Sequence, residues 1–139
     1  MNDKDILKYR LNNQQLVKPE FTDPADVVRL MGAVQAQDFA AAKWALGLRL
    51  KHSSDHLIEA AYNKGTILRT HLMRPTWHFV TAEDIRWLLA LTAPRVKAQC
   101  ASAYRYYSVT DAVIKKAKRQ WKRRSLQASI LQGQSLQRY

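Results

Sequence analysis

The chain has 139 residues, 47% hydrophobic and 24% charged, which is long enough and apolar enough for one globular domain. It carries 23 Lys and Arg against 11 Asp and Glu, and the resulting net charge of +12 indicates an anionic partner such as nucleic acid. We expect a cytoplasmic protein that neither spans a membrane nor is secreted, because no long apolar stretch is present and a lone cysteine, Cys100, fits a reducing compartment.

Two helices are predicted in the first quarter of the chain. Residues 3–11 fit a short helix with a mixed face. Asp23 followed by Pro24 is a helix start signal, because an acidic cap precedes a proline in the first turn. Apolar residues then recur at steps of three and four, which predicts an amphipathic helix over 24–34. Its expected buried stripe consists of Val27, Leu30, Met31 and Val34.

Two further helices are predicted before residue 65. Asp38 can cap the first of them, which continues to about Leu50. Its apolar positions are Phe39, Ala42, Leu46 and Leu50. Ser53 or Ser54 starts the second, over 55–64, and Gly65 is placed to end it.

A β-hairpin is predicted next. Residues 66–71 and 76–80 are rich in β-branched and aromatic side chains, and Met73-Arg74-Pro75 forms a short connection between them. Alternation along the second strand places Trp77 and Phe79 on one face. The opposite face of this strand then carries Thr76, His78 and Val80.

Three more helices are predicted after the hairpin. Thr81 with Asp84 resembles a capping box and starts a helix that Pro94 is expected to end. Further helices are expected over 95–107 and 110–121.

These elements predict a mainly α fold with a small β-hairpin. Three helices followed by a hairpin is the order of a winged helix, a helix-turn-helix variant, with 55–64 as the recognition helix and 66–80 as the wing. The alternative is an all-helical bundle with an incidental hairpin. We expect a winged-helix domain over 1–81, trailing helices over 82–124 that begin a truncated second unit, and a disordered Gln- and Ser-rich tail over 125–139.

Two glutamines separated by one residue, Gln35 and Gln37, stand between two predicted helices. They project in similar directions only if the backbone there is extended. The alternative is that both are ordinary residues at a helix end and that Asp38 serves only as a cap. The residue pattern alone leaves both interpretations open.

A polar patch is predicted on the hairpin. If the strand register matches, Arg69, His71, Thr76 and His78 lie together beside the helices. Two imidazoles and a guanidinium in one patch can contact phosphates or position a water molecule. The alternative is a half-exposed sheet face with ordinary hydrogen bonding.

The positive charge is concentrated near the end of the chain. After Asp111 there are eight basic residues and no acidic residue, so the body of the chain is only mildly basic. The run from Lys115 to Arg124 can follow a nucleic-acid backbone, or it can be a solvated helix surface. The candidate DNA-contacting residues are Arg69, His71, Arg74, Thr76, His78, Lys115, Lys116 and Arg119.

Neither a metal site nor a cofactor is expected. His52 and His56 are four residues apart, but no third ligand clusters with them. The sequence has no Gly-rich phosphate loop, and it offers no serine nucleophile with a histidine base.

Three segments, taken together, resemble a known family. They are Arg10-Leu11 with Gln15-Leu16, the segment from Met31 to Asp38, and the segment from Leu72 to Val80. In this order and spacing they are similar to the N-terminal part of the winged-helix DNA-binding proteins that include AlkZ-type DNA glycosylases. The resemblance covers about residues 7–110.

The resemblance implies a function in DNA repair. It implies tandem winged helices, double-stranded DNA as the partner, and release of alkylated bases by hydrolysis of the N-glycosidic bond, including unhooking of interstrand crosslinks. The catalytic element of the family is glutamine, one intervening residue, then glutamine. It maps here onto Gln35 and Gln37.

The resemblance covers only the N-terminal part of the longer family members. We therefore expect a truncated chain whose activity is vestigial or depends on a partner. The acid-free end of the chain has the composition of a sequence translated out of its reading frame. One alternative function is a non-catalytic DNA-binding transcriptional regulator that uses 55–64, although Asp55 and Glu59 would be repelled by phosphates. Another is a structural fragment whose exposed helices over 95–121 bind a partner chain.

Overall fold

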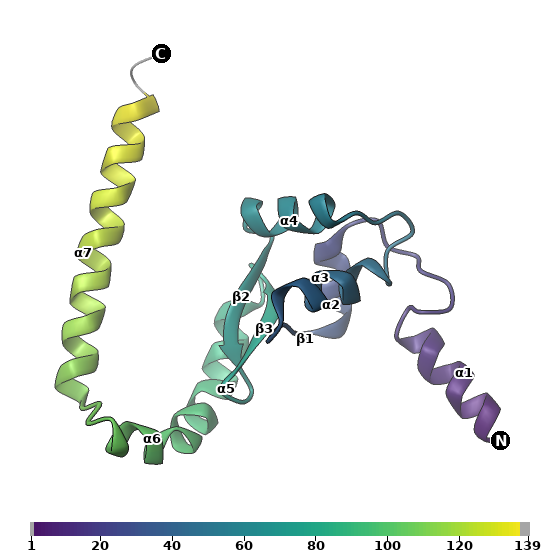
Figure 1. Ribbon diagram of the computed structural model, residues 1–139, viewed down its shortest axis with the longest axis horizontal. Coiled ribbons are helices and arrows are strands. Elements are labelled where there is room, and N and C mark those ends of the chain that lie inside the picture. Colours follow the sequence, from purple (N-terminus) through teal and green to yellow (C-terminus); the bar gives the residue numbers. More distant parts are fainter. Residues whose placement is uncertain (1, 137–139) are drawn as a thin grey trace. The chain divides into compact units, whose positions relative to one another are not determined.

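The computed structural model describes residues 2–136, with side chains described for residues 2–124. The chain divides into two compact units, residues 1–99 and 100–139. In chain order the elements are α1 (Asp3–Asn13), α2 (Pro24–Met31), β1 (Val34–Gln35), α3 (Phe39–Gly47), α4 (Asp55–Lys64), β2 (Ile67–Leu72), β3 (Thr76–Thr81), α5 (Ile85–Gln99), α6 (Ala101–Tyr106) and α7 (Asp111–Leu136) (Figure 1). The described chain is mainly helical with a small β-sheet, as predicted.

A three-stranded antiparallel sheet lies at the centre of the first unit, with the strand order β1-β3-β2. The predicted hairpin is present as β2 and β3, and its register places Arg69 opposite Phe79. The strand β1 pairs with the other edge of β3, where Gln35 lies opposite His78. The sequence predicts only two strands, because a strand of two residues is too short to show an alternating pattern.

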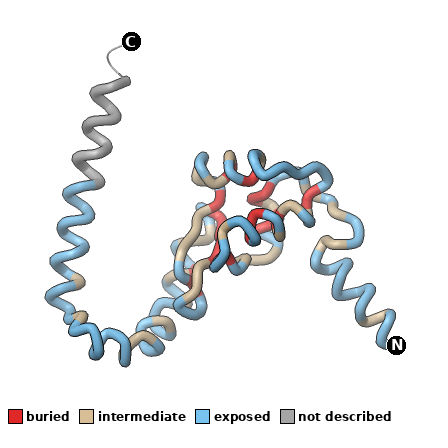
Figure 2. Tube along the Cα trace, in the orientation of Figure 1, coloured by how far each residue is buried: buried red, intermediate tan, exposed pale blue. Residues whose placement is uncertain are grey.

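One face of this sheet and the helices α2, α3 and α4 enclose the main core. Phe79 of β3 is fully buried there, and its ring centroid lies 5.7 Å from that of Phe39 and 6.2 Å from that of Tyr62. Figure 2 shows the buried residues gathered where these helices meet the sheet. The other buried members are Ala25, Val27, Val28, Ala36, Ala42, Leu46, Leu50, Ile58, Ala61 and Ile67.

The opposite face of the sheet packs against α5. Leu72 and Val80 point to this side and form a second, smaller core with Leu88. The sheet is therefore covered on both faces. The helix α5 belongs to the first unit for this reason, whereas the sequence places a boundary after residue 81.

The side chains predicted to cap the starts of helices do so in the structure. Each side chain accepts a hydrogen bond from a backbone N–H of the first turn, which would otherwise lack a partner. The pairs are Asp23 with Ala25 at 2.8 Å, Asp38 with Ala41 at 2.9 Å and Ser54 with Leu57 at 3.1 Å. Gly65 ends α4 as predicted, with a φ of 78° that favours glycine.

The expected buried stripe of α2 is partly wrong. Leu30 is 52% exposed, and the buried side of the helix is formed instead by Pro24, Ala25, Val27 and Val28. The helix ends at Met31, and Gly32 redirects the chain with a φ of 71°. Val34, the last member of the expected stripe, therefore lies beyond the helix, in β1.

The expectation that Pro94 ends a helix is wrong. The helix α5 passes through Pro94 and continues to Gln99. A proline inside a helix removes one backbone hydrogen bond, and Ala93 and Arg95 on either side are good helix formers. The expected helix over 95–107 is instead divided between the end of α5 and the separate helix α6.

The second unit consists of α6 and α7, and no side chain described in it is buried. The helix α7 continues past the expected end at Trp121 as far as Leu136. The predicted disordered tail over 125–139 therefore differs from the structure up to Leu136, and residues 137–139 lie outside the described residues. The extension contains several Gln and Leu residues, which are good helix formers, and it contains no proline.

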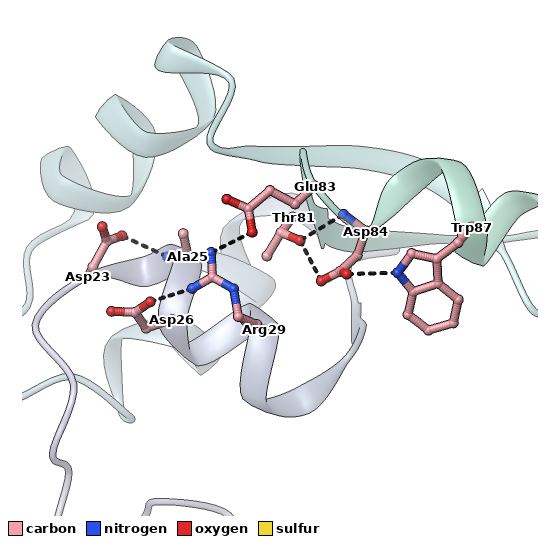
Figure 3. A network of polar contacts seen from close by, with 8 residues as sticks. All are labelled: Asp23, Ala25, Asp26, Arg29, Thr81, Glu83, Asp84 and Trp87. Atoms are coloured by element: carbon pink, nitrogen blue, oxygen red, sulfur yellow. Dashed lines mark hydrogen bonds and ion pairs between the residues drawn. The ribbon is translucent and has the colours of Figure 1, made fainter.

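An arginine connects α2 to the residues that precede α5 (Figure 3). Arg29 binds the carboxylates of Asp26 at 2.6 Å and Glu83 at 3.1 Å. The hydrogen bond and charge of Glu83, followed by the weaker contribution of Asp26, raise the pKa of Arg29. These exposed pairs order the surface between the two elements and contribute little to stability.

A second polar cluster starts α5. Asp84 accepts hydrogen bonds from the indole N–H of Trp87 at 2.7 Å and from the hydroxyl of Thr81 at 2.7 Å. Thr81 in turn accepts a bond from the backbone N–H of Asp84, as the capping signal predicts. The bonds from Trp87 and Thr81, with a smaller effect of the Arg29 charge, lower the pKa of Asp84 below its ordinary value.

Acid should therefore remove a stabilising contribution of Asp84. A carboxyl group with a lowered folded-state pKa stabilises the fold above its unfolded-state pKa, and this contribution is lost as the pH falls through the folded-state value. We expect the thermal midpoint of Asp84→Asn to fall less than that of the wild type between about pH 5 and pH 2, measured by circular dichroism. Asp3→Asn, at an exposed position of α1, is the control and should follow the wild type. Equal acid sensitivity of wild type and Asp84→Asn would contradict this assignment.

Candidate functional site

The two glutamines lie on an extended segment at the edge of the sheet. Gln35 ends β1, and the N–H of Ala36 donates to the carbonyl of Trp77 at 2.8 Å. Ala36 is completely buried, whereas Gln35 and Gln37 on either side of it are exposed. Successive side chains of an extended chain point to opposite sides, so both amides point away from the core. The backbone condition that the sequence sets for this pair is met.

The amide of Gln37 is held by the neighbouring strand. Its Oε1 accepts a hydrogen bond from the backbone N–H of Trp77 at 3.2 Å. Because only the oxygen of the amide can accept from an N–H, the bond fixes which end of the group faces the strand. The Nε2 of Gln37 is thereby left to donate to another group. Among the described residues, no comparable bond restrains the side chain of Gln35.

A carboxylate directly follows the pair. Asp38 is exposed, and its Oδ1 caps α3 through the N–H of Ala41. The expected capping role is therefore confirmed. The capping bond also fixes the position of the carboxylate at the point where the extended segment becomes a helix.

Arg69 reaches the same segment from β2. Its Nε donates to the carbonyl of Ala36 at 3.0 Å, and its Nη2 donates to the carbonyl of Gln37 at 3.1 Å. The guanidinium carbon lies 4.8 Å from the ring centroid of Trp77 and 5.6 Å from that of Phe39. At these distances both rings attract the cation. Arg69, which the sequence suggests as a DNA contact, is engaged inside the protein.

The polar patch expected on the hairpin is divided between the two faces of the sheet. His71 lies opposite Trp77, so Arg69 and His71 share one face while Thr76 and His78 lie on the other. His78 is only 7% exposed, and its Nδ1 lies 3.0 Å from the carbonyl of Thr76. The expected patch requires a register shifted by one residue, and such a shift moves every side chain to the opposite face.

The remaining candidate DNA contacts are exposed. Arg74 lies in the turn between β2 and β3, and His71 is exposed with its ring 4.0 Å from that of Trp77. Lys115, Lys116 and Arg119 are exposed on α7 in the second unit. Their role in DNA binding stays a prediction.

An ion-pair cluster joins α3 to α4. Lys43 has a side chain that is 11% exposed, and its Nζ lies 2.8 Å from Oδ2 of Asp55 and 3.4 Å from Oε2 of Glu59. The hydrogen bond from Lys43 to Asp55 raises the pKa of Lys43, and the Glu59 charge adds to this effect, although burial acts in the opposite direction. The acidic residues of α4 are thus partly neutralised from within the protein.

Two hollows of the described chain are lined by residues other than the glutamine pair. A groove of about 520 Å³ is lined by Met73, Arg74, Leu91, Thr92 and Arg95. A smaller hollow of about 270 Å³ lies between α3 and α4. Within the part of the chain that the structure describes, no three His, Cys, Asp or Glu side chains form a possible metal site, and no helix is long and apolar enough to cross a membrane.

Comparison with known families identifies the chain. The family described as DNA glycosylase AlkZ-like matches residues 28–134, which include the glutamine segment, the sheet and both helices of the α3–α4 pair. The chain belongs to this AlkZ-like family. No curated protein and no solved structure matches it. The resemblance stated from the sequence is confirmed, and it relates this AlkZ-like chain to DNA repair glycosylases.

Sequence reasoning missed the two bonds of Arg69 to the glutamine segment. Arg69 is separated by 33 residues from Ala36, and the bond exists only because β3 lies between β1 and β2. Nothing in the local pattern around Arg69 indicates this arrangement. Only the register of the β2–β3 hairpin shows that Arg69 lies on the same face of the sheet as Phe79.

The alternating burial of the glutamine segment can be tested by enlarging its middle residue. We expect Ala36→Leu to destabilise the fold by about 1–3 kcal/mol, because added methylene groups have no space in a packed core. Gln35→Leu, at the exposed neighbour, should change the free energy of unfolding by less than about 0.5 kcal/mol. Urea denaturation of both variants measures the difference. Similar values for the two would contradict the burial pattern.

Proposed function

We propose that this AlkZ-like chain binds double-stranded DNA through a winged-helix domain and that Gln35 and Gln37 promote hydrolysis of the N-glycosidic bond of alkylated purines. One observation carries the proposal. The two amides project from the sheet edge on one extended segment, in a chain of the AlkZ-like family. The resemblance to this family implies a catalytic element of glutamine, one residue, glutamine.

The order of the elements supports the winged helix. The succession α2, β1, α3, α4, β2, β3 with the strand order β1-β3-β2 matches that of a winged helix-turn-helix. In this interpretation α3 and α4 form the helix-turn-helix, and β2 with β3 forms the wing. The proposed domain covers residues 1–81, with α5 packed against its sheet.

The surface of α4 argues against a regulator that reads base sequence. In a helix-turn-helix the second helix enters the major groove. Here Asp55 and Glu59 remain 69% and 50% exposed in their side chains while they bind Lys43. Carboxylates at these positions disfavour approach to phosphates. We therefore assign contact with DNA to the wing and to α7.

The proposed chemistry suits neutral amides. A purine alkylated on a ring nitrogen already carries positive charge, so it leaves the sugar as a neutral base without strong acid catalysis. The requirements are a positioned water molecule and stabilisation of an oxocarbenium-like sugar. Amide oxygens are fixed dipoles that stabilise developing positive charge.

The geometry supports a division of roles. Gln37, held by Trp77, orients the water through its Nε2, and the Oε1 of Gln35 stabilises the sugar. The water oxygen bonds to C1′ as the C1′–N bond breaks and its electron pair returns to the base. The water proton passes to the carboxylate of Asp38 or to a phosphate, because an amide cannot take it.

Replacing both glutamines separates catalysis from binding. We expect Gln35→Ala with Gln37→Ala to lower the rate of base release from alkylated duplex DNA by about 100-fold or more, since removal of a single preorganised polar group costs that much. The affinity for DNA should stay within about threefold, a change of less than about 1 kcal/mol. Chromatographic detection of the free alkylated base and a fluorescence binding titration give the two values.

Gln99→Ala is the matched control, because it removes an exposed amide on α5 far along the chain from the pair. Its rate should equal that of the wild type. Undiminished release by the double variant would contradict the catalytic assignment. DNA binding by a wild-type chain that releases no base would support the regulator instead.

The basic face of α7 should bind phosphates. Removal of one lysine or arginine that binds a phosphate reduces the slope of log affinity against log salt concentration by about 0.9. We expect the combined change of Lys115, Lys116 and Arg119 to alanine to reduce this slope by up to about 2.7. Binding to unmodified duplex DNA at several salt concentrations measures it.

The control removes the same charge elsewhere. Lys4, Lys8 and Arg10 are exposed on α1, and their replacement by alanine lowers the net charge equally. This variant should keep the wild-type slope. If both triple variants reduce the slope to the same extent, net charge rather than α7 governs binding.

A further inference from the structure

The pairing between β1 and β3 is incomplete where the glutamine segment leaves the sheet. The N–H of Ala36 donates to the carbonyl of Trp77, but the N–H of Trp77 donates to the side chain of Gln37 rather than to the carbonyl of Ala36. The carbonyl of Ala36 is therefore free to accept another donor. At this pair, one of the two ladder bonds is replaced by a bond to a side chain, so the position of the segment depends in part on side chains.

Arg69 supplies the missing donors. Its Nε bonds the carbonyl of Ala36, and its Nη2 bonds the carbonyl of Gln37. These two carbonyls belong to the last two peptide units before Asp38, where the chain turns into α3. One planar guanidinium thus binds two successive carbonyls of the glutamine segment.

The aromatic rings around Arg69 determine its direction. Arg69 starts from β2, and the ring of Trp77 on β3 lies along the path of its side chain toward Ala36. Phe39, in the first turn of α3, lies on the guanidinium at 5.6 Å. Lysine cannot reproduce this arrangement, because an ammonium group has neither the planar surface nor the fork of donors.

We propose that Arg69 is a positioning residue for the glutamine pair. By holding the carbonyls of Ala36 and Gln37, it fixes the backbone from which both amides project, and it keeps Gln37 within reach of the N–H of Trp77. This inference rests on the proposed catalytic role of Gln35 and Gln37. It replaces the expectation that Arg69 contacts DNA, because two of its donors are already engaged within the protein.

The experiment compares two arginine-to-lysine variants. Arg69→Lys keeps the charge but removes the fork of donors. Arg49→Lys is the matched control, because Arg49 also donates to a backbone carbonyl, that of Ala45, which lies on α3 outside the glutamine segment. Each variant is assayed for base release in single-turnover reactions with saturating protein, for duplex affinity and for its thermal midpoint.

We expect Arg69→Lys to release base about 100-fold more slowly than the wild type, since small displacements of reacting groups have effects of this size. Its duplex affinity should stay within about threefold of the wild-type value. Arg49→Lys should keep the wild-type rate. In Arg69→Ala, added guanidinium ion should restore part of the rate, which a role in folding alone does not predict.

A measurement on the protein without DNA tests the positioning role of Arg69 independently of the proposed function. Hydrogen exchange of the Trp77 N–H reports its bond to Gln37, and we expect it to be faster in Arg69→Lys than in Arg49→Lys. Unchanged exchange, or a wild-type rate of base release in Arg69→Lys, overturns the positioning role. A decrease of duplex affinity in proportion to rate shows a DNA contact instead. Absence of base release by the wild type overturns the proposed function, whatever the exchange shows.

Discussion

The short strand β1 is held in place by its neighbours, and the geometry of the candidate site depends on that placement. A strand of two residues is not stable by itself. Its position comes from the burial of Ala36 in the main core and from backbone pairing with β3. Because the middle residue of the glutamine segment belongs to the core, the stability of the fold and the direction of the two amides cannot vary independently.

The two units differ in what keeps them folded. The first has two cores, one on each face of the sheet, and Phe79 and Val80 connect them through adjacent positions of β3. In the second, every described side chain is at least partly exposed. Over its described side chains, up to Arg124, α7 therefore has no buried face, and the intrinsic helix preferences of its residues matter more than they do in the first unit. Neutralisation of its lysines and arginines by a polyanion would favour the helix.

Local signals explain what could be predicted from the sequence. Asp23, Asp38 and Ser54 act as caps through contacts within three residues, and Gly65 ends α4 through its own backbone angle. The spacing of the glutamine pair is also local, but the residue pattern alone leaves its role open, and the catalytic interpretation came from the family resemblance.

Long-range geometry explains what could not be predicted. The face occupied by His78 depends on the hairpin register, and this register depends on a turn in which Met73 adopts a φ of 60°. The reach of Arg69 depends on the strand order. The continuation of α5 through Pro94 shows that a proline flanked by good helix formers, here Ala93 and Arg95, does not always end a helix.

The engagement of Lys43 by Asp55 and Glu59 has a consequence for target choice. Lys43 is the one basic residue in the sequence of α3, and its amine is bound by Asp55 and Glu59 of α4. The helix α4, which would enter the major groove, therefore presents two carboxylates to the solvent. Under the proposed function, the protein would distinguish damaged from intact DNA by how readily a base departs. The identity of the flanking nucleotides would then have little influence on which lesions are processed.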